Sequence, residues 1–358
     1  MTAAQQRVVV MQPLPGIGDM IWHLPHIRAL ADQAGGPVTL VAKPRSRADE
    51  IFAAETTVRD IIWVDRNPSA GAGRHDGPLG VWRLIHALRA GRFDAAVLLH
   101  HSPTLAFATL AAGVPRRQGY GTGVQRRFLN HGPHLSAEQW RRNRPLQRAT
   151  LYLQAAGVPI ADHEPRLPVA PTARRAVQEK LRRVPRPFAV LGIGSSEPTR
   201  QWGAARFAGL ARALIDAGWQ AIALVGGRNE EALSREIANA LGDDARLLVP
   251  ALGWHLGETA AVLSEAAFYV GNDTGVMNMA AAVGTRAYAL FGATPALEHS
   301  ANIMPIMSPP GPADGAARIT LGKVLDVLER DRGSLGPAGM AAPAAAGWRG
   351  SRGAPGLV

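Results

Sequence analysis

The chain has 358 residues, no cysteine and a formal net charge of +11, which arises from 39 Lys and Arg against 28 Asp and Glu. This length exceeds what one hydrophobic core usually supports, so we expect two domains, and the apolar content of 47% is enough to give each of them a core. The absence of cysteine excludes disulfides, thiolate metal sites and thiol nucleophiles, and it is typical of a cytosolic protein.

Short β-rich runs alternate with Ala- and Leu-rich amphipathic stretches in the first half of the chain. Such alternation predicts a parallel sheet with helices on both faces. The expected strands are 8–14, 37–42, 61–64 and 95–100, and the expected helices are 20–34, 46–54, 79–90 and 103–112. The N-terminal stretch is typical of a first strand rather than a signal peptide, and no apolar run reaches the length of a membrane-spanning helix. Residues 161–175, which are polar and rich in Pro, predict a linker.

The same alternation starts again after this linker. The expected strands are 187–194, 221–227, 246–251, 267–273 and 286–292, and the expected helices are 203–217, 229–241, 257–265, 274–283 and 319–332. We therefore predict an α/β protein of two doubly wound, Rossmann-like domains, 1–165 and 166–332. Residues 333–358 contain much Gly, Pro and Ala but few large apolar side chains, and this composition predicts a disordered tail.

The first candidate site is the stretch PGIGDMIWHLP, which follows the first expected strand. Gly16 and Gly18 allow a tight turn, and Asp19 falls at the start of a helix. A carboxylate in this position is compatible with two roles, because it can cap the helix N-terminus or act as a general base at the rim of the sheet. The residues alone leave both roles open.

Two further polar turns follow strands in the second half. In GIGSSEPTRQW, Ser195 and Ser196 offer hydroxyls and amides, and Arg200 offers a forked, permanently charged donor that suits phosphate oxygens. An ordinary loop is the alternative for this stretch. In LVGGRNEEA, Glu230 can accept a hydrogen bond from a ribose hydroxyl, or it can simply stabilise the dipole of the helix that it starts.

The most informative stretch is FYVGNDTGVMNMAAAVGT. Its strand ends at Asp273, and Thr274 and Gly275 then open a helix of small residues, so that a diphosphate can approach the helix N-terminus closely. A companion turn, LFGATP, follows the next strand. Because the chain contains no D-x-D pair, we expect no metal ion to bridge a sugar diphosphate, and leaving-group charge is then met by Arg200 and by helix amides.

Two common nucleotide-binding patterns are excluded. The G-x-G segments GIGDMI, GTGVQR and GIGSSE each lack the third glycine of the dinucleotide-binding motif, and no P-loop pattern occurs.

Eight arginines lie close together between residues 116 and 148: Arg116, Arg117, Arg126, Arg127, Arg141, Arg142, Arg144 and Arg148. A basic surface attracts phosphate on nucleic acid, on anionic lipid or on a charged substrate, although a solvated face is the simpler alternative. No zinc-finger or RNP-like aromatic pattern accompanies these arginines. Nucleic acid is therefore the weakest of the three partners.

These motifs together resemble glycosyltransferase family 9, the heptosyltransferases of lipopolysaccharide core synthesis. The resemblance rests on PGIGDMIWHLP, on TRQWGAARF, and on GNDTGVMNMAAAVGT followed by ALFGATP; it covers about residues 1 to 330. It implies a GT-B fold, with an acceptor-binding N-terminal domain and a nucleotide-sugar-binding C-terminal domain that face a central cleft and close about 161–175. It also implies that a sugar is transferred from a nucleoside diphosphate without a metal ion and with inversion of the anomeric centre. We expect the sugar to be heptose and the nucleoside diphosphate to be ADP.

The resemblance also implies roles for individual residues. Asp19 matches the family's general base, and Arg200 stands where Lys is usual and stabilises the departing diphosphate. The implied nucleotide-sugar-binding residues are Ser195, Ser196, Arg200, Glu230, Asp273, Thr274, Gly275 and Asn278. Asn278 replaces the family's His and cannot carry positive charge, so we expect a weaker phosphate contact there.

The expected acceptor is a lipopolysaccharide-core or related anionic glycolipid. The residues expected to bind it are Gly18, Lys43, Arg45, Arg126 and Arg127. We further expect a cytoplasmic monomer in peripheral contact with the inner membrane surface, with no cofactor and no nucleic-acid partner. Two other functions stay open: a GT-B-like nucleotide-sugar epimerase, which releases a changed sugar without any acceptor, and a non-catalytic homologue that binds a nucleotide or a lipid surface.

Overall fold

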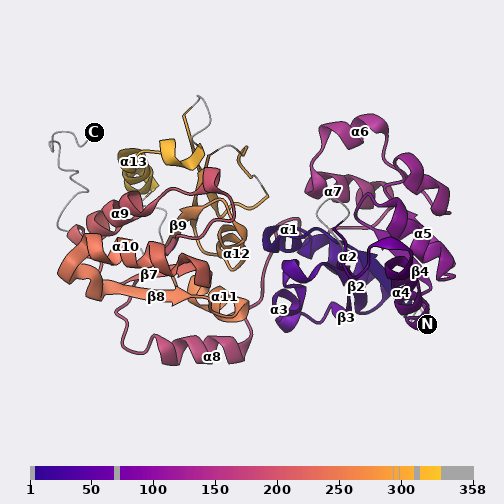
Figure 1. Cartoon of the computed structure of the whole chain (residues 1–358), viewed down its shortest axis with the longest axis horizontal. Coiled ribbons are helices and arrows are strands. Elements are labelled where there is room, and N and C mark those ends of the chain that lie inside the picture. The colour runs from indigo at the N-terminus through magenta and orange to yellow at the C-terminus, as the bar shows by residue number, and fades with distance from the viewer. Residues whose placement is uncertain (1–4, 68–72, 293, 298, 310–314, 332–358) are drawn as a thin grey trace. The chain divides into compact units, whose positions relative to one another are not determined.

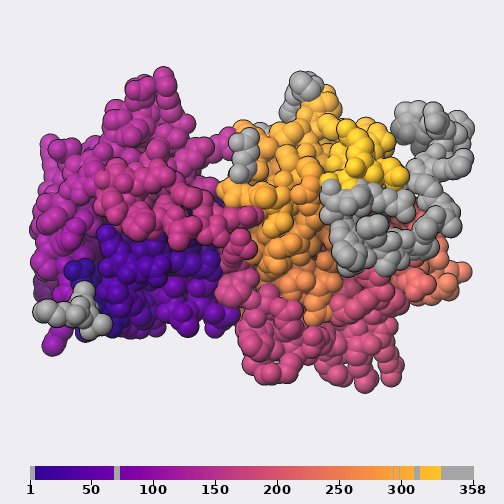
Figure 2. Space-filling view, turned by 180° about the vertical axis from the view of Figure 1, so that it is seen from behind, coloured from indigo at the N-terminus to yellow at the C-terminus, as the bar shows by residue number. Residues whose placement is uncertain are grey.

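A computed structural model describes residues 5–67, 73–292, 294–297, 299–309 and 315–331 of the chain. The chain forms two compact units, Met1–Arg166 and Leu167–Val358. In Figures 1 and 2 the first unit runs from indigo to magenta and the second from pink to yellow. The predicted tail, 333–358, lies outside the described residues.

The first unit is built on a five-stranded, fully parallel sheet in the order β3-β2-β1-β4-β5. Its strands are β1 (Val8–Met11), β2 (Val38–Ala42), β3 (Val58–Trp63), β4 (Ala95–Leu98) and β5 (Arg116–Gly119). Its helices are α1 (Ile17–Trp22), α2 (Leu24–Ala34), α3 (Ala48–Ile51), α4 (Gly77–Ala90), α5 (Pro103–Ala111), α6 (Ala137–Arg142) and α7 (Pro145–Ala155).

Helices cover both faces of this sheet, which explains why β1, with the sequence VVVM, is apolar and buried at every position. Val9 and Met11 point to one face and pack in a cluster with Leu84 and Leu88 of α4. Helices α2 and α7 cover the opposite face (Figure 1).

The second unit contains a six-stranded parallel sheet in the order β11-β10-β9-β6-β7-β8. Its strands are β6 (Ala189–Gly192), β7 (Ile222–Gly226), β8 (Leu248–Leu252), β9 (Phe268–Asn272), β10 (Ala287–Phe291) and β11 (Ile303–Met307). Its helices are α8 (Pro171–Lys180), α9 (Ala204–Asp216), α10 (Glu231–Leu241), α11 (Leu256–Ser264), α12 (Gly275–Ala282) and α13 (Leu321–Asp331).

The core of the second unit lies mainly between its sheet and α9, α10 and α13. Leu191 and Val270 of the sheet pack there with Phe207 and Leu210 of α9. Helices α11 and α12 lie on the other face, and α8 packs against α11, where Lys180 pairs with Glu258 (Figure 1). No helix within the described residues is both long enough and apolar enough to cross a lipid bilayer.

Each sheet has one place where the strand order reverses. In the first unit the chain leaves β1 toward β2 and β3 and later returns to the other side of β1 with β4. In the second unit the corresponding place lies between β6 and β9. Loops at the carboxyl ends of the two neighbouring strands diverge at such a point and leave room for a ligand. The structure therefore directs attention to the loops after β1 and β4 and to those after β6 and β9.

The structure corrects several details of the secondary structure expected from the sequence. The expected helix 20–34 is broken at His23, because Pro25 has no N–H with which to continue the helix that starts at Ile17. The last third of the expected linker 161–175 is wrong, since helix α8 begins at Pro171. The sequence analysis also missed four elements: β5, α6, α7 and β11.

Candidate functional site

The reversal point of the second sheet is held together by Asn272, the last residue of β9. Its side chain is fully buried and reaches across to the loop after β6. Its Oδ1 accepts a hydrogen bond from the Trp202 backbone N–H at 3.1 Å, and its Nδ2 donates to the carbonyl oxygens of Ile193 at 3.2 Å and Gly194 at 3.0 Å. The loops that follow β6 and β9 are thereby fixed relative to each other.

Asp273 links three loops at this point. One of its carboxylate oxygens, Oδ2, accepts a hydrogen bond of 2.6 Å from the Thr294 hydroxyl and lies 3.4 Å from Nη1 of Arg200. Arg200 also pairs with Glu197, at 3.1 Å. Asp273 is only 6% exposed, whereas the Arg200 side chain is 27% exposed, so the guanidinium reaches the mouth of the site while it is paired with Asp273 and Glu197.

Helix α12 begins immediately after Asp273, with Thr274 as its N-cap residue. Thr274 and Gly275 are partly exposed, so backbone N–H groups at the start of the helix are accessible to an anion. Asn278 is only 3% exposed, and its Nδ2 donates to the Thr274 carbonyl oxygen at 2.9 Å. Asn278 therefore lies beside the expected diphosphate position with its amide nitrogen bonded to the helix backbone.

The floor of this site is the hydroxyl end of Tyr269, which lies over two glycines. A Cβ atom on Gly192 would come within 1.9 Å of the Tyr269 hydroxyl oxygen, and one on Gly271 would come within 2.3 Å. Because the ring is fully buried, the pKa of its hydroxyl is raised and the group stays protonated. Glycine is thus required at both strand ends by the close approach of this ring.

The remaining predicted residues of the second unit lie on adjacent loops. Ser195 bonds within its own turn, with its hydroxyl donating to the Glu197 carbonyl oxygen at 2.7 Å, and Ser196 is exposed. Glu230 lies at the start of α10, and its carboxylate carbon is 3.5 Å from where a Cβ of Gly194 would be. The loops after β6, β7 and β9 thus bring Arg200, Glu230 and Asp273 to one edge of the sheet.

In the first unit, Asp19 occupies the third position of α1 and caps the helix. Its Oδ2 accepts a hydrogen bond of 3.0 Å from the backbone N–H of Gly16. A Cβ on Gly16 would come within 2.6 Å of that oxygen, so the glycine allows the carboxylate to fold back over the turn. The capping role that the sequence left open is therefore present, and the partly buried Asp19 still lies at the carboxyl edge of the sheet.

The backbone of Asp19 is fixed by buried groups behind it. His23 Nδ1 lies 2.7 Å from the Asp19 carbonyl oxygen, which can only accept, so this nitrogen carries the proton and donates. Gln12 Nε2 donates to the same Asp19 carbonyl oxygen at 3.5 Å. Burial lowers the pKa of His23 from 6.5 to about 4, so the ring is neutral near pH 7.

Two histidines from the loop after β4 lie across the reversal point from the Asp19 turn. Burial, followed by the charges of His101 and Lys43, lowers the pKa of His100 from 6.5 to about 4. His101 Nδ1 lies 2.8 Å from the Thr122 hydroxyl, and its ring contacts Trp140 of α6. The sequence analysis did not select these residues, although a His-His pair at a strand end was a visible signal.

The predicted acceptor residues also follow the strands of the first sheet at its carboxyl edge. Gly18 lies after β1, Lys43 and Arg45 lie after β2, and Arg126 and Arg127 lie in a 3₁₀ turn after β5. Arg45, Arg126 and Arg127 are exposed, and in the part of the chain that is described their side chains have no hydrogen-bond or ion-pair partner. These three residues place unpaired positive charge on two sides of the Asp19 turn.

Two sheets of this kind, each with its polar residues at the carboxyl side of a reversal point, define a GT-B glycosyltransferase fold. A family 9 glycosyltransferase from Veillonella parvula shares it, with a TM-score of 0.76 and 19% identity over 92% of this chain and 98% of that one. ADP-heptose lipopolysaccharide heptosyltransferase II from Escherichia coli has a TM-score of 0.72 and 22% identity over 92% of this chain and 98% of that one. E. coli heptosyltransferase WaaC with ADP-2-deoxy-2-fluoro heptose has a TM-score of 0.69 and 19% identity over 91% of this chain and 99% of that one. The predicted fold class is confirmed.

The sequence comparisons identify the family. The profile of glycosyltransferase family 9 (heptosyltransferase) matches residues 81–305, and this chain belongs to that family. Lipooligosaccharide heptosyltransferase 2 of Haemophilus influenzae is 30% identical over 226 residues, which are 60% of this chain and 64% of that protein. Lipopolysaccharide heptosyltransferase 2 of Escherichia coli is 27% identical over 244 residues, which are 63% of this chain and 69% of that protein. The matched part therefore spans less than two thirds of the H. influenzae relative.

Proposed function

We propose that the chain is an inverting, metal-independent glycosyltransferase that moves heptose from ADP-heptose to a lipopolysaccharide-core or related glycolipid. The observation that carries this proposal is the cluster of Arg200, Asp273 and the start of α12 at the reversal point of the second sheet. A guanidinium and a row of helix N–H groups at one sheet edge suit the two phosphates of a nucleoside diphosphate. The names of the similar proteins support ADP and heptose as the two parts of the donor.

In the proposed reaction the acceptor hydroxyl oxygen bonds to the anomeric carbon while the bond from that carbon to the diphosphate oxygen breaks. The proton of the hydroxyl passes to the carboxylate of Asp19, and the ADP leaves with the electron pair of the broken bond. Attack from the face opposite the leaving group inverts the anomeric centre. Arg200 and the N–H groups at the start of α12 stabilise the charge that develops on the diphosphate.

The donor side of the proposal assigns Glu230 to the ribose hydroxyls and Ser195, Ser196 and Thr274 to phosphate or sugar oxygens. Arg200 is paired with Glu197 in the structure, and Glu197 is half-exposed. A diphosphate competes directly with this carboxylate for the guanidinium. Donor binding is therefore expected to replace the Glu197 contact and to keep the buried contact with Asp273.

The acceptor side assigns Lys43, Arg45, Arg126 and Arg127 to phosphates and carboxylates of an anionic glycolipid, with Gly18 in the turn that it approaches. The same charges would hold the enzyme at the inner surface of the membrane. Basic side chains with no partner among the described residues can bind such groups without first breaking an ion pair.

Two measurements on the purified chain test this function. First, ADP is expected to raise the thermal unfolding midpoint more than GDP or UDP, because a ligand that binds only the folded state stabilises it. Second, ADP release from ADP-heptose is expected only when a Kdo–lipid A acceptor is present. A changed free sugar without acceptor would instead identify an epimerase, and nucleotide binding without turnover would identify a binding protein.

A further inference from the structure

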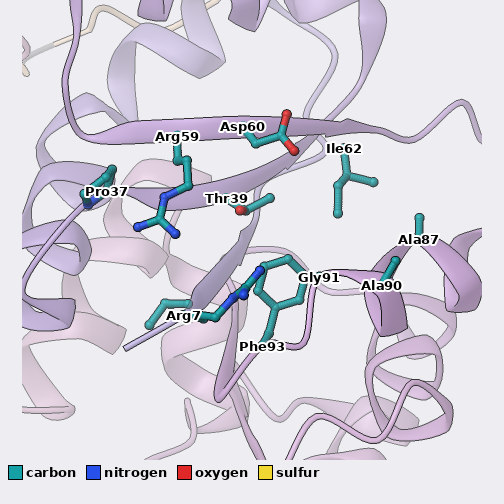
Figure 3. Close-up of a pocket in the computed structure, with 11 residues that line it drawn as sticks. Arg7, Pro37, Thr39, Arg59, Asp60, Ile62, Ala87, Ala90, Gly91 and Phe93 are labelled. Carbon is teal, nitrogen blue, oxygen red and sulfur yellow. The ribbon is translucent and has the colours of Figure 1, made fainter. Parts of the chain in front are cut away.

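A cavity of about 290 Å³ lies at the amino-terminal edge of the first sheet, the edge opposite Asp19 (Figure 3). It opens between the first residues of β1, β2 and β3 and the C-terminal end of α4. Its volume is close to the lower end of the range for small-molecule sites. None of the residues that line it belongs to the proposed donor or acceptor site.

The floor of this cavity is formed by the first sheet and is polar, although the rest of that face of the sheet is apolar. Val41 and Ile62 are paired in register and pack toward α4, whereas the next pair on that face, Thr39 and Asp60, places a hydroxyl and a carboxylate under the end of the helix. The helix side of the cavity is formed by the small residues Ala87, Ala90 and Gly91. The sheet and helix therefore leave a space with a polar floor instead of closing over it.

A β-bulge in β3 directs an arginine into this space. The pairing of β2 with β3 passes from Val38–Val58 to Thr39–Asp60, so Arg59 is an extra residue with no partner in the register. Neighbouring residues of a regular strand point to opposite faces, but a bulge re-aims one of them. As a result, both Arg59 and Asp60 line the cavity.

Arg7 supplies a second guanidinium from the other side. Its backbone is fixed by Asp94, whose Oδ2 accepts from the Arg7 N–H at 2.8 Å and whose own N–H donates to the Arg7 carbonyl oxygen at 2.9 Å. Figure 3 shows the side chain of Arg59 extending into the space beside Thr39 and the side chain of Arg7 extending into it next to Phe93. Within the described ranges, neither guanidinium has a hydrogen-bond or ion-pair partner.

Phe93 gives the cavity an apolar wall. A Cβ on Gly91 would come within 2.1 Å of the Phe93 ring, so the ring lies directly against the backbone at the end of α4. Phe93 is largely buried and lines the cavity together with Ile62. A ligand in this position thus meets two positive charges, one carboxylate, one hydroxyl and an aromatic surface.

We propose that this cavity binds a small sugar phosphate, which is a ligand separate from the proposed donor and acceptor. Arg7, Arg59 and the Thr39 hydroxyl bind the phosphate, because paired guanidiniums match its oxygens. Asp60 accepts hydrogen bonds from sugar hydroxyls, and Phe93 packs against the carbon face of the sugar. Inorganic phosphate fits less well, because it has no sugar hydroxyls for Asp60 and no sugar ring to cover Phe93.

The test is calorimetric titration of the full chain with glucose 6-phosphate and, separately, with inorganic phosphate. Arg7→Gln and Arg59→Gln are each expected to weaken glucose 6-phosphate binding about tenfold, the effect of losing one charge-assisted contact. Arg92→Gln is the matched control, because Arg92 is exposed at the same corner and does not line the cavity. The dissociation constant of the Arg92→Gln variant for glucose 6-phosphate should stay within about twofold of the value for the unsubstituted chain. Asp60→Asn should reduce the preference for glucose 6-phosphate over inorganic phosphate.

Other results would overturn the proposal. One such result is that glucose 6-phosphate does not bind. Another is that inorganic phosphate binds as tightly as glucose 6-phosphate, and a third is that Arg92→Gln weakens glucose 6-phosphate binding as much as Arg7→Gln and Arg59→Gln do. Loss of glucose 6-phosphate binding in saturating ADP would place the sugar phosphate in the nucleotide site instead. Binding of phosphatidic acid vesicles that depends on Arg59, without binding of glucose 6-phosphate, would assign the cavity to a lipid headgroup. Since every readout is binding, the result does not depend on whether the chain transfers a sugar.

Discussion

The carboxyl edges of the two sheets hold their polar groups in different ways. In the second unit, Asn272 and Asp273 are buried and bond to residues of other loops, so several segments distant in sequence fix one geometry. In the first unit, the carboxylate of Asp19 bonds to Gly16 three residues earlier, and nearby arginines are exposed. A network between loops is organised before a ligand arrives and suits a ligand of one shape. The exposed arginines of the first edge have no such network around them and can adapt to a large, charged ligand.

The largest effect is expected at the locally held carboxylate. Asp19→Asn keeps an oxygen that can cap the Gly16 N–H, so the helix start should persist, but it removes the proposed base. Transfer should fall about a thousandfold, the range for loss of a general base, while ADP affinity stays unchanged. Asp49→Asn, an exposed carboxylate in the same unit, is the control. Steady-state rates of ADP release measure the effect, and nearly full activity would exclude Asp19 as the base.

The second prediction tests the network between loops. Asn272→Ala removes the partners of a backbone N–H and of two carbonyl oxygens, and leaving such buried groups unpaired should lower the free energy of unfolding by about 3 kcal/mol. Asn239→Ala, on the exposed face of α10, should change it by less than about 0.5 kcal/mol. Urea unfolding measures both. Equal losses would mean that Asn272 does not join the two loops.

The third prediction concerns the buried groups behind Asp19. The pKa of His23 is about 4 in the folded chain and 6.5 as a free side chain, so the unfolded chain binds the proton first as pH falls. The stabilisation from the neutral ring is present above pH 6.5 and is lost between pH 6.5 and about 4. The free energy of unfolding should therefore drop by about 2 kcal/mol from pH 7 to pH 5 through this residue.

His23→Asn separates titration from hydrogen bonding, because its amide can still donate to the Asp19 carbonyl oxygen. The variant should show a flatter dependence of unfolding free energy on pH. His86→Asn, an exposed histidine of α4, is the matched control. A pH dependence that is the same in all three proteins would argue against His23 as the titrating group.

The fourth prediction returns to the donor edge. Arg200→Gln should weaken ADP binding about tenfold, because the diphosphate loses one charge-assisted partner while the helix N-terminus remains. Arg200→Lys should recover part of the loss, since the charge persists without the fork. Arg175→Gln on the exposed side of α8 removes the same charge elsewhere in the unit. Calorimetry with ADP decides, and equal affinities in the two Gln variants would contradict the assignment.

The smallest effect is expected from the exposed arginines of the first edge. Replacing Arg126 and Arg127 together by Glu should raise the acceptor KM about fivefold at low salt and less at high salt, because exposed charges are screened. The donor KM should not change. The double change Arg174→Glu with Arg175→Glu applies the same charge reversal to α8. If donor and acceptor constants move together, the acceptor assignment is wrong.

The sequence predicted the fold class because strands buried on both faces, such as β1, are continuous apolar runs between amphipathic segments. Edge elements escaped this signal. Strand β5 has the sequence RRQG and is only partly buried, so nothing in its composition separates it from a loop. Helix α8 is hidden in a Pro-rich stretch because a proline at its first position favours a helix start as much as a turn.

The candidate sites were predictable where one short motif contains both the turn and the chemistry. Asp19, Arg200 and Asp273 all lie in such stretches, and the structure places each at the carboxyl edge of its sheet. Thr294, His101 and Gln12 are different, because their importance depends on contacts with residues 21, 21 and 7 positions away. Contacts of that kind arise only when the strands are in register, and a linear pattern does not contain them.

The packing of Tyr269 against two glycines constrains how this chain can change over evolutionary time. A methyl group at Gly192 or Gly271 meets not only the hydroxyl oxygen but also the ring carbon that bears it, so replacing Tyr269 by Phe would not make room. At Gly192 the ring itself must first be exchanged for a smaller side chain, which opens a cavity in the core and destabilises the intermediate. At Gly271 a methyl group would also come within 2.6 Å of the Gly192 carbonyl oxygen, so a smaller side chain at position 269 would not make room there. Gly192 and Tyr269 are therefore expected to change only together, and a lineage that alters this floor of the proposed nucleotide site passes through a less stable ancestor.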